Sequence, residues 1–111
     1  MKILLVEPGC MPVVKEIDNS LEAMQKTVGG LIEALYPFED PVALVCNDEG
    51  KLLELPLNRG LFTPEGQLYD VVAGPFFLCG LGEEDFVSLS DELLAKYRQE
   101  FRYPELFIPS L

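Results

Sequence analysis

The feature that most constrains the fold of this chain is a series of short apolar runs separated by turn-forming residues. The chain has 9 glycines and 9 prolines among its 111 residues, and asparagine and aspartate stand beside several of them. Short apolar runs bounded by such residues are typical of β-strands, whereas a helix needs a longer segment with a repeat near 3.6 residues. The sequence therefore predicts a fold in which strands dominate.

Several segments are predicted as strands, and the residues between them as turns or loops. The strands are Lys2–Val6, Pro12–Ile17, Leu31–Phe38, a pair Val42–Cys46 and Lys51–Leu55, and Val71–Ala73 continued by Pro75–Cys79. Asn47-Asp48-Glu49-Gly50 has the length and chemistry of a turn that closes a hairpin. The last strand is expected to break or kink at Gly74, because the proline that follows cannot donate a ladder hydrogen bond. Leu57–Gly66 is predicted to be a long loop and Gly80–Asp85 an acidic loop.

Two segments carry the apolar stripe of a helix. The first runs from Ser20 to Val28, with an N-terminal cap from Asp18-Asn19-Ser20 and an end at Gly29-Gly30. The second follows Ser90, places Leu94, Tyr97 and Phe101 on one side, and ends before Pro104. The predicted order is β-β-α-β-β-β-β-α, which indicates a single α+β domain over residues 1–111 with two helices packed on a mainly antiparallel sheet.

Charge and cysteine content limit the partners and the compartment. With 19 acidic and 8 basic residues the formal net charge is −11, which disfavours direct binding to nucleic acid or to an anionic membrane. No apolar run is long enough for a membrane helix or a secretory signal, so a bacterial-type cytoplasm is expected. Cys10, Cys46 and Cys79 are too scattered for a disulfide framework; the last two are expected to be buried and Cys10 to be exposed.

The residue types needed for common catalytic sites are largely missing. The chain has no histidine, which removes the commonest general base and the commonest metal ligand. It also has no Cys-x-x-Cys pair, no phosphate-binding glycine loop and no EF-hand spacing. We therefore predict no metal, no cofactor and no catalytic residue, and we consider an enzyme less favoured than a binding protein.

The strongest candidate for a binding surface is Asn58-Arg59 on the predicted long loop. A planar guanidinium beside an amide can hold a carboxylate or a phosphate. The alternative is that Arg59 pairs with a nearby acid while Asn58 organises a turn. Gln25 and Glu33, on either side of the Gly29-Gly30 turn, form a second candidate, for which a solvated face is the alternative. Two further sets complete the assignments: Asn47 joins the candidate surface, and Gly29, Gly30, Gly50 and Gly74 are assigned to structural turns.

Several of these segments together resemble a known family. Leu21–Gln25, Val28–Glu33, Asn47–Lys51, Asn58-Arg59 and the stretch from Asp70 to Gly74 are similar to domain of unknown function 3846, over roughly Ile3 to Phe86. The resemblance implies a protein of phages and of integrated or conjugative elements, without a known activity. It suggests an accessory or counter-defence factor whose partner is another protein.

Three functions remain open on the sequence alone. The first is a protein-interaction domain or accessory factor of a phage or mobile element. The second is an acidic DNA mimic directed at a restriction or repair enzyme, which requires carboxylates in ordered rows. The third is a ligand-binding or catalytic domain in which Arg59 and Asn58 face a buried carboxylate such as Asp70. Exposed sheet edges would also allow a homodimer.

Overall fold

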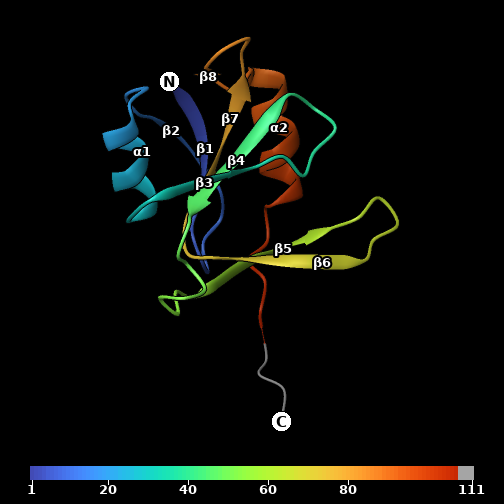
Figure 1. Cartoon of the computed structure of the whole chain (residues 1–111). Coiled ribbons are helices and arrows are strands. Elements are labelled where there is room, and N and C mark those ends of the chain that lie inside the picture. Colours follow the sequence, from blue (N-terminus) through green and yellow to red (C-terminus); the bar gives the residue numbers. More distant parts are fainter. Residues whose placement is uncertain (108–111) are drawn as a thin grey trace.

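A computed structural model describes residues 1–107, which form eight strands and two helices (Figure 1). In chain order these are β1 (Lys2–Val6), β2 (Val13–Glu16), α1 (Leu21–Val28), β3 (Ile32–Leu35), β4 (Val42–Asn47), β5 (Leu57–Phe62), β6 (Leu68–Ala73), β7 (Phe76–Leu81), β8 (Phe86–Val87) and α2 (Asp91–Glu100). Every strand pair in this range is antiparallel. The predicted α+β class with a mainly antiparallel sheet is therefore confirmed.

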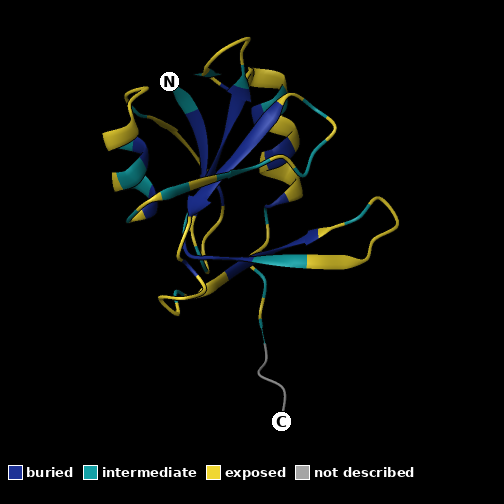
Figure 2. Ribbon diagram, in the orientation of Figure 1, coloured by how far each residue is buried: buried dark blue, intermediate teal, exposed yellow. Residues whose placement is uncertain are grey.

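The larger sheet lies between the two helices. Among the described residues it has six strands, in the order β2-β1-β7-β4-β3, with the short β8 paired to β7. Side chains alternate along a strand, so Leu44 and Leu78 join the core beneath α2, whereas Val45 and Phe77 join the core beneath α1. The three central strands are buried on both faces, which explains why they appear in the sequence as continuous apolar runs (Figure 2).

Both helices begin at the predicted caps. The Ser20 hydroxyl accepts a hydrogen bond from the N–H of Ala23 at 3.1 Å, and the Ser90 hydroxyl accepts one from Leu93 at 3.2 Å. Gly29 ends α1 in the left-handed conformation with φ of 82°, where a side chain would be strained. Within residues 1–107 neither helix has the length and apolar character needed to cross a membrane.

The predicted hairpin after β4 is wrong. Lys51–Leu55 is not a strand, because both edges of β4 are already occupied by β3 and β7. The chain instead turns back at Asn47, whose side-chain oxygen accepts the N–H of Glu49 at 2.8 Å. It then forms a tight helical turn in which the Leu53 N–H donates to the Glu49 carbonyl at 2.8 Å. The apolar residues at 51–55 predict a strand, but β4 has no free edge with which such a strand could pair.

The prediction of a long loop over residues 57–66 is also wrong. Its first part is β5, which pairs with β6 in a separate two-stranded sheet. The sequence does not predict β5 because polar residues and a glycine usually indicate a loop. In the structure the polar side chains of β5 are buried, and hydrogen bonds within the protein satisfy them. The β5–β6 hairpin extends away from the body formed by the larger sheet and the helices (Figure 1).

The predicted break at Gly74 is present, and it separates two sheets. β6 ends before Gly74 and β7 begins after Pro75, so the two halves of the expected strand belong to different sheets. Gly74 has φ of 84°, and a Cβ there would lie 2.6 Å from the Leu55 Cδ1. After the end of β7, the chain reverses through Gly82 and the acidic residues 83–85 into β8, a strand that the sequence did not predict.

Candidate functional site

Asn58 lies inside the protein and connects three parts of the fold. Its side chain is fully buried, and the Nδ2 atom donates to the carbonyl oxygens of Val6 and Gly74, both at 2.9 Å. These bonds hold β5 against the end of β1 and against the turn between the sheets. The asparagine therefore satisfies buried carbonyl groups, and its side chain presents no surface to a partner.

Arg59 is also fully buried, although the sequence placed it on an exposed loop. Its Nη2 atom donates to the carbonyl oxygen of Cys10 at 2.7 Å and to that of Phe101 at 3.0 Å. Its Nη1 atom donates to the Asn58 side-chain oxygen at 2.8 Å. Burial lowers the pKa of Arg59, and the Glu105 charge opposes that shift. The guanidinium binds the Phe101 carbonyl at the end of α2, where the helix dipole favours a cation.

The Gly29-Gly30 turn and Asn47 form one structural junction. The Gln25 backbone carbonyl accepts the N–H groups of Gly29 and Gly30 at 2.8 and 3.0 Å. The Asn47 side chain is buried and donates to the Val28 carbonyl at 3.3 Å. A Cβ at Gly30 would approach the Asn47 Nδ2 to 2.9 Å, so a glycine is needed where the two segments meet.

Glu33 and Asn47 do come together, at a small pocket of about 300 Å³ beside the second sheet. Asp70 lies in the same pocket and forms an ion pair with Lys51 at 2.5 Å, which lowers the pKa of the Asp70 carboxyl. Burial and a hydrogen bond with Asp48 raise the pKa of Glu33. Asp70 thus pairs with a lysine and does not join Arg59, so the pocket of Arg59, Asn58 and Asp70 considered from the sequence does not form.

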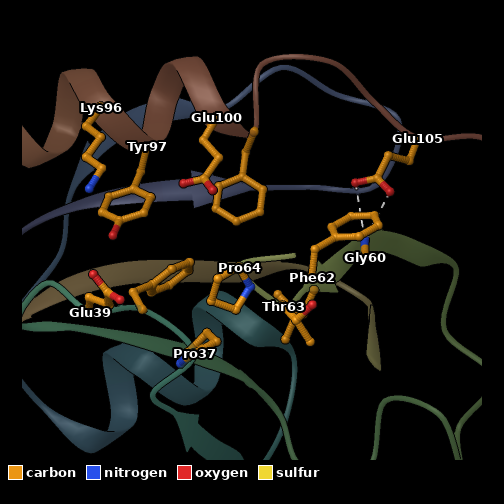
Figure 3. A pocket seen from close by; sticks show the side chains of 13 residues that line it. Pro37, Glu39, Gly60, Phe62, Thr63, Pro64, Lys96, Tyr97, Glu100 and Glu105 are labelled. Atoms are coloured by element: carbon orange, nitrogen blue, oxygen red, sulfur yellow. Dashed lines mark hydrogen bonds between the residues drawn. The ribbon is translucent and has the colours of Figure 1, made fainter. Parts of the chain in front are cut away.

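A larger pocket, which sequence reasoning missed, lies between α2 and the β5–β6 hairpin. It has a volume of about 470 Å³ and is lined by residues 37–39 before β4, residues 60–64 at the start of the hairpin, and residues from Lys96 to Glu105 (Figure 3). The only sequence signals are two proline-containing segments with aromatic neighbours, Pro37-Phe38 and Phe62-Thr63-Pro64. Nothing local indicates that these segments meet.

Aromatic rings form the inner wall of this pocket. The Phe38 ring lies 4.6 Å from the Tyr97 ring and 6.1 Å from the Phe101 ring, measured between centroids. Phe62 stands on the hairpin side and remains 52% exposed. Tyr97 and Phe101 are themselves buried in the core, so Phe62 and the half-buried Phe38 are the rings that a bound group could contact.

Carboxylates surround the rings. Figure 3 shows Glu39, Glu100 and Glu105 at three positions around the pocket. Among residues 1–107 none of the three takes part in an ion pair. Although the Glu100 residue as a whole is exposed, burial of its carboxyl group raises its pKa; nearby Lys96 opposes the shift and Asp40 adds to it. The rim therefore carries three carboxylates without an ion-pair partner among residues 1–107, although Lys96 acts on Glu100 and the buried Arg59 on Glu105 at longer range.

The one lysine in the pocket is already paired. Lys96 forms an ion pair with Asp40 at 2.6 Å, and the Tyr97 hydroxyl donates to the same carboxylate at 2.7 Å. Hydrogen bonds with Lys96 and Tyr97 lower the pKa of Asp40, and the bond with Asp40 raises the pKa of Lys96. Because this lysine and Asp40 offset one another, the three glutamates determine the net charge of the pocket.

The side chains that line this pocket are mainly aromatic rings, prolines and carboxylates. The described residues hold no group of three His, Cys, Asp or Glu side chains that could bind a metal ion. The pocket has no cysteine or histidine and no pair of side chains in the geometry of a nucleophile and its base. Aromatic faces beside carboxylates are the two features that proteins use to hold a cationic side chain.

The fold and pocket define a class: a small antiparallel α+β domain with a buried arginine at its centre and a shallow acidic, aromatic pocket beside a projecting hairpin. The chain belongs to the family described as Domain of unknown function (DUF3846), whose model matches residues 1–102. The match extends further than the resemblance that ended near Phe86, and it includes all of α2. No curated protein and no solved structure matches the chain.

Proposed function

We propose that this chain is a protein-interaction domain that binds a basic segment of a partner protein in the pocket between α2 and the β5–β6 hairpin. The observation that carries the proposal is the rim of Glu39, Glu100 and Glu105, which surrounds aromatic rings and has no ion-pair partner within residues 1–107. We infer from the family resemblance that the domain works in the cytoplasm as an accessory factor of a phage or mobile element.

The size and composition of the pocket support a lysine or arginine side chain as the bound group. The aliphatic stem of such a side chain can cover the ring faces while its charged end stays near the carboxylates. A cation over an aromatic ring contributes roughly 0.5–2 kcal/mol, depending on how far it is desolvated. The formal charge of −11 adds a longer-range attraction that raises the rate of association with basic partners.

Two observations favour this proposal over the alternatives. The acidic residues of α1 and α2 lie on opposite sides of the larger sheet, which fits poorly with the continuous rows that a DNA mimic needs. Arg59 and Asn58 direct their side-chain donors to carbonyl and amide oxygens of the protein, which fits poorly with a ligand site centred on Arg59.

The proposal can be tested with a labelled peptide that alternates lysine and valine, measured by fluorescence polarisation at low and at physiological salt. The double change Glu39→Gln and Glu100→Gln should weaken binding about tenfold, because two carboxylates at the cation are neutralised. The matched control is Glu83→Gln with Glu84→Gln, which removes the same charge from the turn before β8, away from this pocket. Equal effects of the two pairs would show that only net charge matters and would contradict a specific pocket.

A further inference from the structure

On the outer edge of β5, the main-chain N–H of Gly60 is hydrogen-bonded to a side chain and not to another strand. The N–H of Gly60 donates to both carboxylate oxygens of Glu105, at 3.1 and 3.2 Å, as the dashed lines in Figure 3 show. β5 pairs with β6 alone among the described strands. The Gly60 N–H therefore points away from β6, to a position where the carbonyl of a third strand would be found in a wider sheet.

The β5–β6 hairpin is a sheet that can accept another strand. A two-stranded sheet is only marginally stable by itself, and its outer edges carry main-chain groups without a strand partner. Part of the β5 edge is closed by the end of α2, since Arg59 binds the Phe101 carbonyl. The last part of β5, from Gly60 to Phe62, lines the acidic pocket, so a strand added there would run directly past the aromatic rings and the glutamates.

The absence of a side chain at position 60 keeps this edge closely packed on one face. A Cβ at Gly60 would lie 2.6 Å from the Leu68 Cδ1 and 3.1 Å from the Phe62 Cε2. Phe62 and Leu68 therefore close over the glycine, and both are more than half exposed on their other side. A bound strand would cover part of this exposed apolar surface as well as the edge.

We infer that the basic partner segment binds in an extended conformation along the Gly60–Phe62 edge of β5, and that Glu105 competes with it for the Gly60 N–H. The inference rests on the proposed function and adds the shape of the ligand and its competitor. Strand addition supplies main-chain hydrogen bonds, and the alternation of side chains places every second residue of the partner over the rings. In the free protein the Gly60 N–H donates to the Glu105 carboxylate; in the complex it donates to a carbonyl oxygen of the partner.

Two variants of Glu105 separate competition from simple charge. Glu105→Gln removes the charge and keeps an acceptor for the Gly60 N–H, whereas Glu105→Ala removes both. If Glu105 competes with the partner, the alanine variant should bind the lysine–valine peptide about threefold or more tightly than the glutamine variant. If Glu105 contributes only charge, the two variants should bind equally and more weakly than the unchanged protein. Thermal melting of each variant shows whether the fold is retained.

A second peptide tests the extended conformation directly. The same lysine–valine peptide with N-methyl groups at alternate residues cannot donate main-chain hydrogen bonds on one side, and it should bind about tenfold more weakly if it joins the sheet. Equal binding of the two peptides, or of the two Glu105 variants, would overturn strand addition and leave the proposed function standing. If the unmodified peptide binds neither the unchanged protein nor the Glu105→Ala variant, the proposed function fails and this inference fails with it.

Discussion

The Arg59 guanidinium donates two hydrogen bonds to the carbonyl oxygen of Phe101, at 3.0 Å from Nη2 and 3.3 Å from Nε, and so ties the second sheet to the end of α2. The two residues stand 42 positions apart in the chain. A second carbonyl, that of Cys10, accepts from the same side chain. One buried arginine thus holds together the β1–β2 connection, β5 and the C-terminal helix.

Arg59→Ala should therefore destabilise the fold. The substitution leaves two buried carbonyl groups without their donor and opens a cavity, so we expect a loss of about 3 kcal/mol in the free energy of unfolding. Thermal and urea unfolding followed by circular dichroism would measure it. The matched control is Arg98→Ala on the exposed side of α2, for which little change is expected. This outcome is opposite to that of an exposed binding loop, in which the alanine change would leave stability intact.

Gly74→Ala should be more harmful than Gly66→Ala. Both glycines have a positive φ, 84° and 85°, so an alanine at either position carries the cost of the left-handed conformation, about 1 kcal/mol. Only at Gly74 does the new Cβ also collide, because the Leu55 side chain lies 2.6 Å away, whereas nothing lies within 4 Å of Gly66. Comparing the melting temperatures of the two variants isolates the steric part. Equal losses would show that the Leu55 side chain moves aside without cost.

Glu100→Gln should raise stability near neutral pH. The pKa of Glu100 is raised in the folded protein, mainly by burial of the carboxyl group, so ionisation of this group opposes folding. The stabilising contribution of the neutral form is complete below the unfolded pKa near 4.3 and is lost as pH rises through the folded value. We expect the glutamine variant to melt about 1–3 °C higher at pH 7 and at the same temperature as the unchanged protein below about pH 4.

The same Glu100→Gln variant should bind the basic peptide more weakly, because it lacks one of the carboxylates proposed to hold the cation. Glu100 would then be an example of a charge kept for function at some expense of stability. Melting curves at pH 7 and at pH 3.5, collected alongside the peptide titrations, test both effects on one variant. A lower melting temperature for Glu100→Gln at pH 7 would contradict the assigned pKa direction.

Cys10 should be the only rapidly reactive thiol in the native protein. The chain has 3 cysteines; Cys10 is exposed, whereas Cys46 and Cys79 are buried, as expected from the sequence. Burial also raises the pKa of Cys46 to about 11 and that of Cys79 to about 12, which removes the reactive thiolate. Titration with a disulfide reagent at pH 8 should release one equivalent quickly and the other two only after unfolding. A Cys10→Ser variant should lose the fast phase.

Much of the fold could be predicted from local patterns. Apolar runs located β1, β4 and β7, which form the centre of the larger sheet; serine caps located the start of both helices, and a glycine stop located the end of α1. These signals work because caps, turns and burial on both faces depend on residues that lie close together in the chain. Because the predicted strands cluster and do not alternate with helices, their order was then enough to indicate the α+β class.

The second sheet and both candidate pockets depended on the tertiary structure. Asn58 and Arg59 were taken for loop residues because polar side chains are usually exposed, and only distant carbonyl groups make their burial favourable. The acidic pocket likewise needs residues near 38, 62 and 100 to meet. The sequence by itself determined the two helices and the central strands β1, β4 and β7, since the caps and apolar runs that specify them are local. Which edges paired, and which polar groups were buried, was decided by contacts between residues far apart in the chain.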